Sequence, residues 1–165
     1  MLRRLLAAVA ALGLLGLNVA QAEGRNEAEP LFESDVVGSI PGAAIGGVLS
    51  GGVQWVVRRG KASLADNGML RLEVKGLLLA AGNLAGTTGP VTMVAASLVC
   101  GGSGGTLMAS TSAVPLSPGG NAEIRETITL PPSCLGPVVL VRVFNSMAPV
   151  GSQLGPFIAA TGFLH

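Results

Sequence analysis

The segment Lys61-Ala-Ser-Leu-Ala-Asp-Asn-Gly-Met-Leu-Arg-Leu-Glu-Val-Lys75 decides the fold. An Asn-Gly pair between two alternating runs is one of the strongest sequence signals for a β-hairpin. After the pair, Leu70, Leu72 and Val74 alternate with charged residues, which is typical of a strand with one buried face. This part of the chain therefore predicts two antiparallel strands.

The hydrophobic pattern also sets the register of this hairpin. A two-residue loop would place Leu64 opposite Arg71, whereas a three-residue loop over 66–68 places it opposite Leu70. A slip of one residue moves every side chain to the other face of a sheet. We therefore predict the three-residue loop, with Gly68 in the left-handed conformation.

Other short runs of β-branched and apolar residues, separated by Gly and Pro, predict further strands. They cover residues 53–58, 91–100, 106–114, 122–130, 137–145 and 157–164. No segment after the N-terminal apolar run has the pattern of an amphipathic helix, and we expect residues 77–89 to form a loop. The sequence thus predicts an all-β domain over 53–165, an antiparallel β-sandwich of about seven to eight strands.

The composition agrees with this fold and excludes one class of partner. The chain has 25 Gly, one Trp, four Phe and no Tyr, so its core must consist of Val, Leu, Ile and Ala. It holds 10 basic and 9 acidic residues. This near-neutral balance predicts no binding to nucleic acid.

The first 22 residues have the pattern of a secretory signal peptide. Arg3-Arg4 precede an apolar run over 5–17, and Ala20-Gln21-Ala22 resembles a cleavage site. We expect cleavage after Ala22 and a secreted or periplasmic mature protein.

Residues 23–52 are expected to form a disordered linker, acidic at first and then rich in Gly. The uncharged run Val36–Val57 allows an alternative, a membrane-tethered envelope protein. Its many glycines and few large aliphatic residues disfavour a membrane helix. The linker, with no stable membrane span, is the interpretation that the composition favours.

Cys100 and Cys134 are the two cysteines of the chain. An even number of cysteines in an exported protein favours a disulfide. No His, Cys or carboxylate cluster has the spacing of metal ligands, so we predict no metal site and no cofactor.

The run Gly101-Gly-Ser-Gly-Gly105 matches the G-x-S-x-G motif of serine hydrolases. Glu123, Glu126 and His165 follow Ser103 in the order acid, then base. The motif requires a sharp turn from a strand into a helix, but here both flanks have strand patterns. We therefore predict a hairpin loop and a protein that is not an enzyme, with a hydrolase using Ser103 as the alternative.

Two features of the sequence could form a binding surface, Trp55 and a group of basic residues. Trp55 begins a strand, which favours a place in the core over an exposed ligand platform. Basic side chains on the expected hairpin could contact acidic glycans or lipid head groups, although cross-strand pairs such as Lys61 with Glu73 are the simpler account. The candidate surface binding residues are Arg58, Arg59, Lys61 and Arg71.

The chain resembles a family of small secreted bacterial β-domain proteins without an assigned activity. The residues that carry the resemblance include 68–77, 95–100, 122–125, 130–134 and 158–163. The resemblance implies a disulfide-linked β domain.

The G-x-L-x-L-x-V-x-G-L element of residues 68–77 is also similar to the CHRD domain of secreted proteins. The histidines usual after that element are absent here, so no metal role is carried over.

Together these features predict a secreted, non-catalytic β-sandwich protein. We expect a binding or structural module of the cell envelope or exterior, whose unknown ligand could be a glycan or another envelope component. The sequence leaves the oligomeric state open.

Overall fold

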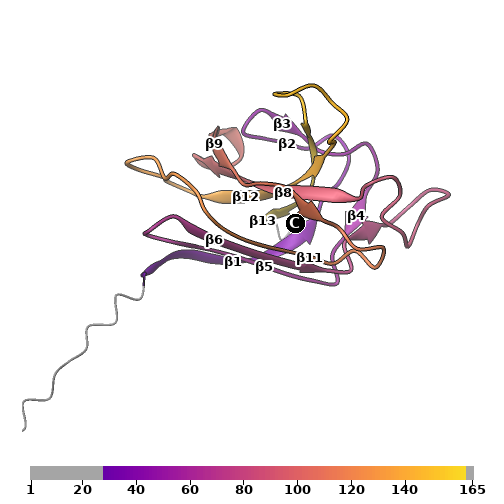
Figure 1. Ribbon diagram of the computed structural model, residues 1–165, viewed down its shortest axis with the longest axis horizontal. Coiled ribbons are helices and arrows are strands. Elements are labelled where there is room, and N and C mark those ends of the chain that lie inside the picture. Colours follow the sequence, from indigo (N-terminus) through magenta and orange to yellow (C-terminus); the bar gives the residue numbers. More distant parts are fainter. Residues whose placement is uncertain (1–27, 163–165) are drawn as a thin grey trace, which may run out of the picture.

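The computed structural model describes residues 28–162, and within this range the fold is all-β (Figure 1). Nine of its strands form one curled antiparallel sheet in the order β10-β8-β12-β13-β1-β5-β6-β11, with β9 also paired to β8. These strands are β1 (Pro30–Gly38), β5 (Arg59–Ala65), β6 (Met69–Lys75), β8 (Met93–Cys100), β9 (Thr106–Ser110), β10 (Val114–Pro115), β11 (Ala122–Thr127), β12 (Val138–Phe144) and β13 (Leu154–Thr161). The predicted fold class is confirmed.

Strand β1 joins the two layers into which the sheet curls. Its first part, residues 30–35, pairs with β5, and its last part, residues 36–38, pairs with β13. The layer of β1, β5, β6 and β11 thereby faces the layer of β8, β12 and β13 (Figure 1). The main core fills the space between them, and its buried members other than Trp55 are aliphatic, as the composition requires.

The β5–β6 hairpin has the predicted register. Leu64 pairs with Leu70, Ala62 pairs with Leu72, and residues 66–68 form the loop. Gly68 has a φ of 82°, which an L side chain rarely adopts. The amide of Gly68 donates to the carbonyl oxygen of Ala65 at 2.9 Å and closes the turn.

The prediction of a disordered linker over 23–52 is wrong for the residues that the structure describes, because residues 30–38 form β1, a strand inside the sheet. Phe32, Ser34 and Val36 point inward along β1, while Glu33 and Asp35 are exposed. The acidic residues therefore lie on the outer face of a strand instead of in a solvated tail. The signal peptide expected over 1–22 lies outside the described residues.

The Gly-rich part of the expected linker is also ordered structure. Strands β2 (Ala44–Ile45) and β3 (Val48–Leu49) pair around Gly46 and Gly47, whose φ values are 57° and 75°. Two left-handed residues in a two-residue loop are the signature of a tight hairpin turn. Within residues 28–162 no helix is long and apolar enough to cross a membrane.

A second, smaller core lies between the β2–β3 hairpin and the outer face of the sheet. Its buried members are Ile45, Val99, Val138, Leu140, Phe157 and Ala160. The hairpin covers the layer of β8, β12 and β13 on the side away from the main core (Figure 1).

Trp55 belongs to the core, as predicted, with 5% of its surface exposed. It begins β4 (Trp55–Val56), which pairs with β7 (Leu78–Leu79) inside the segment expected to be a loop. The chain passes Trp55 so closely at Gly38 that a Cβ atom there would lie 2.0 Å from the Trp55 carbonyl oxygen.

The two edges of the curled sheet are linked through Glu126. Its sequence position predicts an edge strand or a bulge, and β11 is indeed the last strand on its side of the sheet. The Glu126 carboxylate accepts the backbone N–H of Ser112, which precedes the opposite edge strand β10, at 2.9 and 3.1 Å. This contact connects the two layers at a place where β10 and β11 do not pair as strands.

The predicted disulfide between Cys100 and Cys134 is present, with their Cα atoms 5.0 Å apart. Next to it the amide of Gly101 donates to the carbonyl oxygen of Leu135, and that of Gly102 donates to Gly136. The disulfide and these two hydrogen bonds together hold the glycine-rich loop after β8 against the segment that leads into β12.

Candidate functional site

A pocket of about 520 Å³ lies between the β2–β3 hairpin and the end of β1. Such a volume falls within the range of about 300–1,000 Å³ that small-molecule sites occupy. The lining residues are Val37, Gly38, Ser39, Ile40, Ala43, Ala44, Ile45, Ser103, Phe157 and Ala160. Of these described residues none is charged, and two carry a side-chain hydroxyl.

The deep and the open sides of the pocket differ in exposure. Ser39, Ile45, Phe157 and Ala160 are buried, with 2–5% of their surface exposed. Ile40, by contrast, is 61% exposed. The pocket is therefore an apolar recess in the surface.

Ser39, one of the lining residues, carries a buried hydroxyl group whose hydrogen-bonding capacity is unsatisfied. Its backbone is fully used, because its N–H donates to the Ile158 carbonyl at 3.0 Å and its own carbonyl accepts the Trp55 N–H at 2.9 Å. Its Oγ, however, is buried and has no hydrogen-bond partner among the described residues. A buried hydroxyl without a partner costs free energy, and such exceptions often mark functional sites.

Backbone hydrogen bonds fix the hairpin over the pocket at two places. The Gly51 amide donates to the Phe157 carbonyl at 2.8 Å, and the Gly46 amide donates to the Ser103 carbonyl at 3.0 Å. A third bond, from the Ala43 amide to Ser50 Oγ at 3.0 Å, closes the base of the hairpin. The pocket is thus preformed.

Ser103 lines the pocket without the surroundings of a hydrolase nucleophile. It lies in a short 3-10 turn, Gly102–Gly104, between strands β8 and β9, as the strand patterns predict. Glu123 pairs with Arg125, Glu126 holds Ser112, and neither lines the pocket. His165 lies outside the described residues. Within 28–162 no group of three or more metal-binding side chains could hold an ion.

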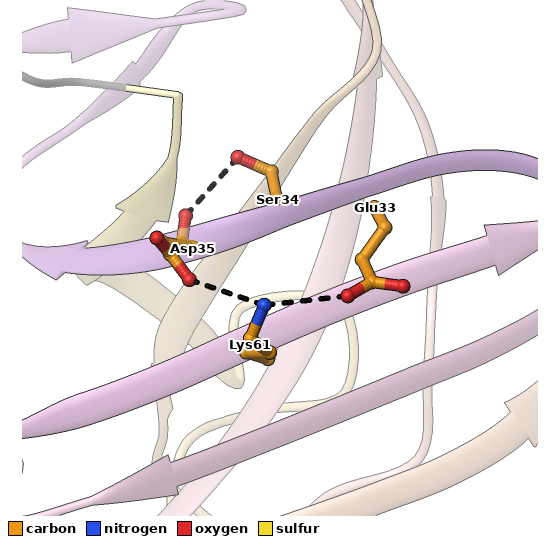
Figure 2. A network of polar contacts seen from close by, with 4 residues as sticks. All are labelled: Glu33, Ser34, Asp35 and Lys61. Carbon is orange, nitrogen blue, oxygen red and sulfur yellow. Dashed lines mark hydrogen bonds and ion pairs between the residues drawn. The ribbon is translucent and has the colours of Figure 1, made fainter.

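Lys61, one of the candidate surface binding residues, is engaged by two carboxylates of β1. Figure 2 shows its Nζ between Glu33 and Asp35, at 3.3 and 3.5 Å. The hydrogen bond to Glu33 and the negative charges of Asp35 and Glu33 raise the pKa of Lys61.

Lys61 faces Glu73 in register, as predicted. Glu73 instead pairs with Lys75, whose hydrogen bond lowers the Glu73 pKa. The predicted cross-strand pairing of Lys61 with Glu73 is confirmed in register, but the charged groups of both residues form their ion pairs with other side chains.

The remaining candidate surface residues do not form one basic patch. Arg59 and Arg71 lie with Lys61 on the outer face of β5 and β6, where acidic and basic side chains interleave. Arg58 instead lines a separate recess with Val56, Gly76 and other residues. A role of these four residues in binding stays a prediction.

Arg142 is a buried cation that the sequence pattern did not single out. It is 8% exposed and donates to the carbonyl oxygens of Leu154 and Gly155 at 2.7 and 2.8 Å. Burial lowers the pKa of its guanidinium. Arg142 fixes the start of β13 against β12 and does not line the pocket.

The sequence does not predict the pocket, because the linker expected over 23–52 includes the residues that form the hairpin above it. The signal that could have found it is the run Ile45-Gly-Gly-Val48, in which two glycines between β-branched residues favour a hairpin.

Comparisons with protein-family models, curated proteins and solved structures found no match for this chain. The resemblance to secreted β-domain proteins and to the CHRD domain stays a prediction.

Proposed function

We propose that this chain is an exported, non-catalytic binding module, and that its binding site is the pocket beneath the β2–β3 hairpin. The single observation that carries the proposal is a preformed apolar recess of about 520 Å³ whose described lining residues carry no charge. Concave, mostly apolar sites with few polar groups are where proteins bind small molecules. The disulfide supports the export, because such bonds persist in oxidising compartments.

The proposal can be tested with Nile red, an uncharged dye whose fluorescence rises in apolar surroundings. We expect the wild-type protein to bind the dye and Ala43→Trp to lose this binding, since Ala43 lines the pocket and packs against the second core, where an indole ring takes up pocket volume. Leu49→Trp is the matched control. Leu49 belongs to the same hairpin but is exposed and does not line the pocket.

Dye binding that is equal in wild type and Ala43→Trp would refute the pocket as the site. Loss of dye binding in both tryptophan variants would mean only that the hairpin tolerates no indole ring, so both variants are first compared by their thermal unfolding. The smaller change Ala43→Leu then decides, because it narrows the pocket without adding a ring.

A further inference from the structure

We propose that a second recess, just after the end of β6, binds a small aliphatic carboxylate, and that Arg58 and Asn121 hold the carboxylate group. This site, called here the Arg58 recess, is separate from the pocket beneath the β2–β3 hairpin and goes beyond the proposed function. The proposal follows from the hydrogen-bond donors, the charge and the apolar walls of the recess.

The Arg58 recess lies where the two-stranded sheet of β4 and β7 meets the turn after β6 and the start of β11. Val56 and Leu78 line it from the two short strands, Gly76 lines it after β6, and Asn121 lines it before β11. Its volume of about 480 Å³ falls within the range of about 300–1,000 Å³ that small-molecule sites occupy. It shares no lining residue with the first pocket. The two sites can therefore be tested separately.

The two polar side chains of the recess meet at Gly76. The Gly76 amide donates to Asn121 Oδ1 at 3.1 Å. Arg58 packs over the same glycine, since a Cβ atom at Gly76 would lie 2.9 Å from Arg58 Cβ and 3.6 Å from Arg58 Nε. The guanidinium of Arg58 and the side-chain amide of Asn121 are therefore brought to one short stretch of backbone.

These two side chains offer hydrogen-bond donors and no free acceptor. Asn121 Oδ1 is occupied by the Gly76 amide, which leaves the Nδ2 donors of Asn121 without an acceptor among the described residues. A guanidinium has donors only, and Arg58 forms no ion pair with another described residue. The complementary ligand group is one that only accepts hydrogen bonds.

The charge of the recess narrows this group to a carboxylate. Arg58 is the one charged residue among the described lining residues. A carboxylate carries one negative charge, and its two oxygens match the planar fork of a guanidinium. A phosphate monoester carries a charge of about −1.5 to −2 at neutral pH, so a single arginine would leave part of that charge uncompensated.

The remaining walls favour a ligand with an aliphatic body. Val56, Val57 and Leu78 line the recess, and Val56 is 45% exposed. Covering an exposed valine with hydrocarbon removes apolar surface from water, which favours binding. An acidic sugar would instead bring hydroxyl groups that find no partner on these walls.

The test compares 3-methylbutanoate with its uncharged isostere 3-methylbutanamide at neutral pH and constant ionic strength. Binding is followed through the methyl NMR signals of Val56 and Val57 and the side-chain amide signals of Asn121. We expect the carboxylate to shift these signals and to bind about tenfold more tightly than the amide, because the amide has no charge to pair with Arg58. Arg58→Gln should lower the affinity for the carboxylate about tenfold and leave that for the amide unchanged.

Arg59→Gln is the matched control. Arg59 is the next residue along the chain and is also basic, but it lies on the outer face of β5 and does not line the recess. It should bind 3-methylbutanoate as the wild type does. Arg58→Lys keeps the charge without the planar fork and should bind with intermediate affinity.

Three outcomes would overturn the proposal. One is equal affinity for the carboxylate and the amide. Another is an equal loss in Arg58→Gln and Arg59→Gln, which would show only a general attraction of anions to basic side chains. The third is tighter binding of isobutyl phosphate than of 3-methylbutanoate. If Arg58→Gln does not fold, Arg58→Lys decides, because wild-type affinity in that variant would overturn the role of the fork. None of these results bears on the proposed function, which the Nile red experiment tests at the other pocket.

Discussion

The backbone N–H of Trp55 donates to the carbonyl oxygen of Ser39 at 2.9 Å, and this contact joins the main core to the pocket. Trp55 is buried between the layers, whereas Ser39 lines the recess on the other side of the chain. The position of the Ser39 side chain is thus set by the core. Its unsatisfied hydroxyl is a fixed feature of the fold.

The first prediction concerns the stability of the ligand-free protein. Ser39→Ala should raise the free energy of unfolding by about 1–3 kcal/mol, because it removes a buried hydroxyl that has no partner. Urea denaturation measures the change. Ser97→Ala is the control, since Ser97 is also buried but its Oγ lies 2.7 Å from Ser110 Oγ. This second variant should lose stability, and an equal loss in Ser39→Ala would show that Ser39 has a partner after all.

The second prediction tests the close approach of the chain at Gly38. Gly38→Ala should lower the free energy of unfolding by more than about 3 kcal/mol, because the added Cβ would lie 2.0 Å from the Trp55 carbonyl oxygen. Gly52→Ala is the control, since a Cβ there meets nothing within 4 Å. Thermal unfolding of both variants is the measurement. Similar melting temperatures would contradict the packing of β1 against Trp55.

The third prediction concerns the disulfide. Its cysteines are 34 residues apart, and a loop of that length gives about 4 kcal/mol of stabilisation on the chain-entropy model. Reduction should therefore lower the free energy of unfolding by about this amount in denaturant titrations. The Cys100→Ser, Cys134→Ser double variant should be as unstable as the reduced protein and insensitive to reductant. A wild type that reductant leaves unchanged would contradict the stabilising role.

The fourth prediction concerns the contact between the two edges of the sheet. Glu126→Ala should speed hydrogen exchange at the Ser112 amide, because the carboxylate that accepts this N–H is removed. Glu123→Ala is the control, since the Glu123 carboxylate accepts a hydrogen bond from Arg125 on its own strand and does not bond Ser112. Exchange followed by NMR is the measurement. Protection of Ser112 that survives in Glu126→Ala would refute the link.

The fold could be predicted where local chemistry determines it. The β5–β6 register follows from alternating Leu and charged residues around an Asn-Gly turn, a pattern that has one consistent pairing. The disulfide follows from two cysteines in a chain whose N-terminal pattern predicts export. The strand β1 could not be predicted in this way. Its partners β5 and β13 are distant in sequence, and its exposed Glu33 and Asp35 give it the composition of a tail.

The candidate site was beyond sequence reasoning for the same reason. Its lining comes from residues 37–45, from Ser103 and from β13, which only the tertiary fold brings together. The hydroxyl of Ser39 is distinctive because its neighbours leave it without a partner, and no local pattern encodes that. Ser103 was singled out for a catalytic motif, but its observed role is to line the pocket and to accept the Gly46 amide.

The measurement that tests the central claim most directly is a crystal structure of the wild-type protein equilibrated with 1-octanol. We predict density for the alkyl chain between the β2–β3 hairpin and β13, against the apolar lining residues Ile45, Phe157 and Ala160. A pocket that holds only ordered water in crystals equilibrated with a saturated solution of 1-octanol would contradict the account.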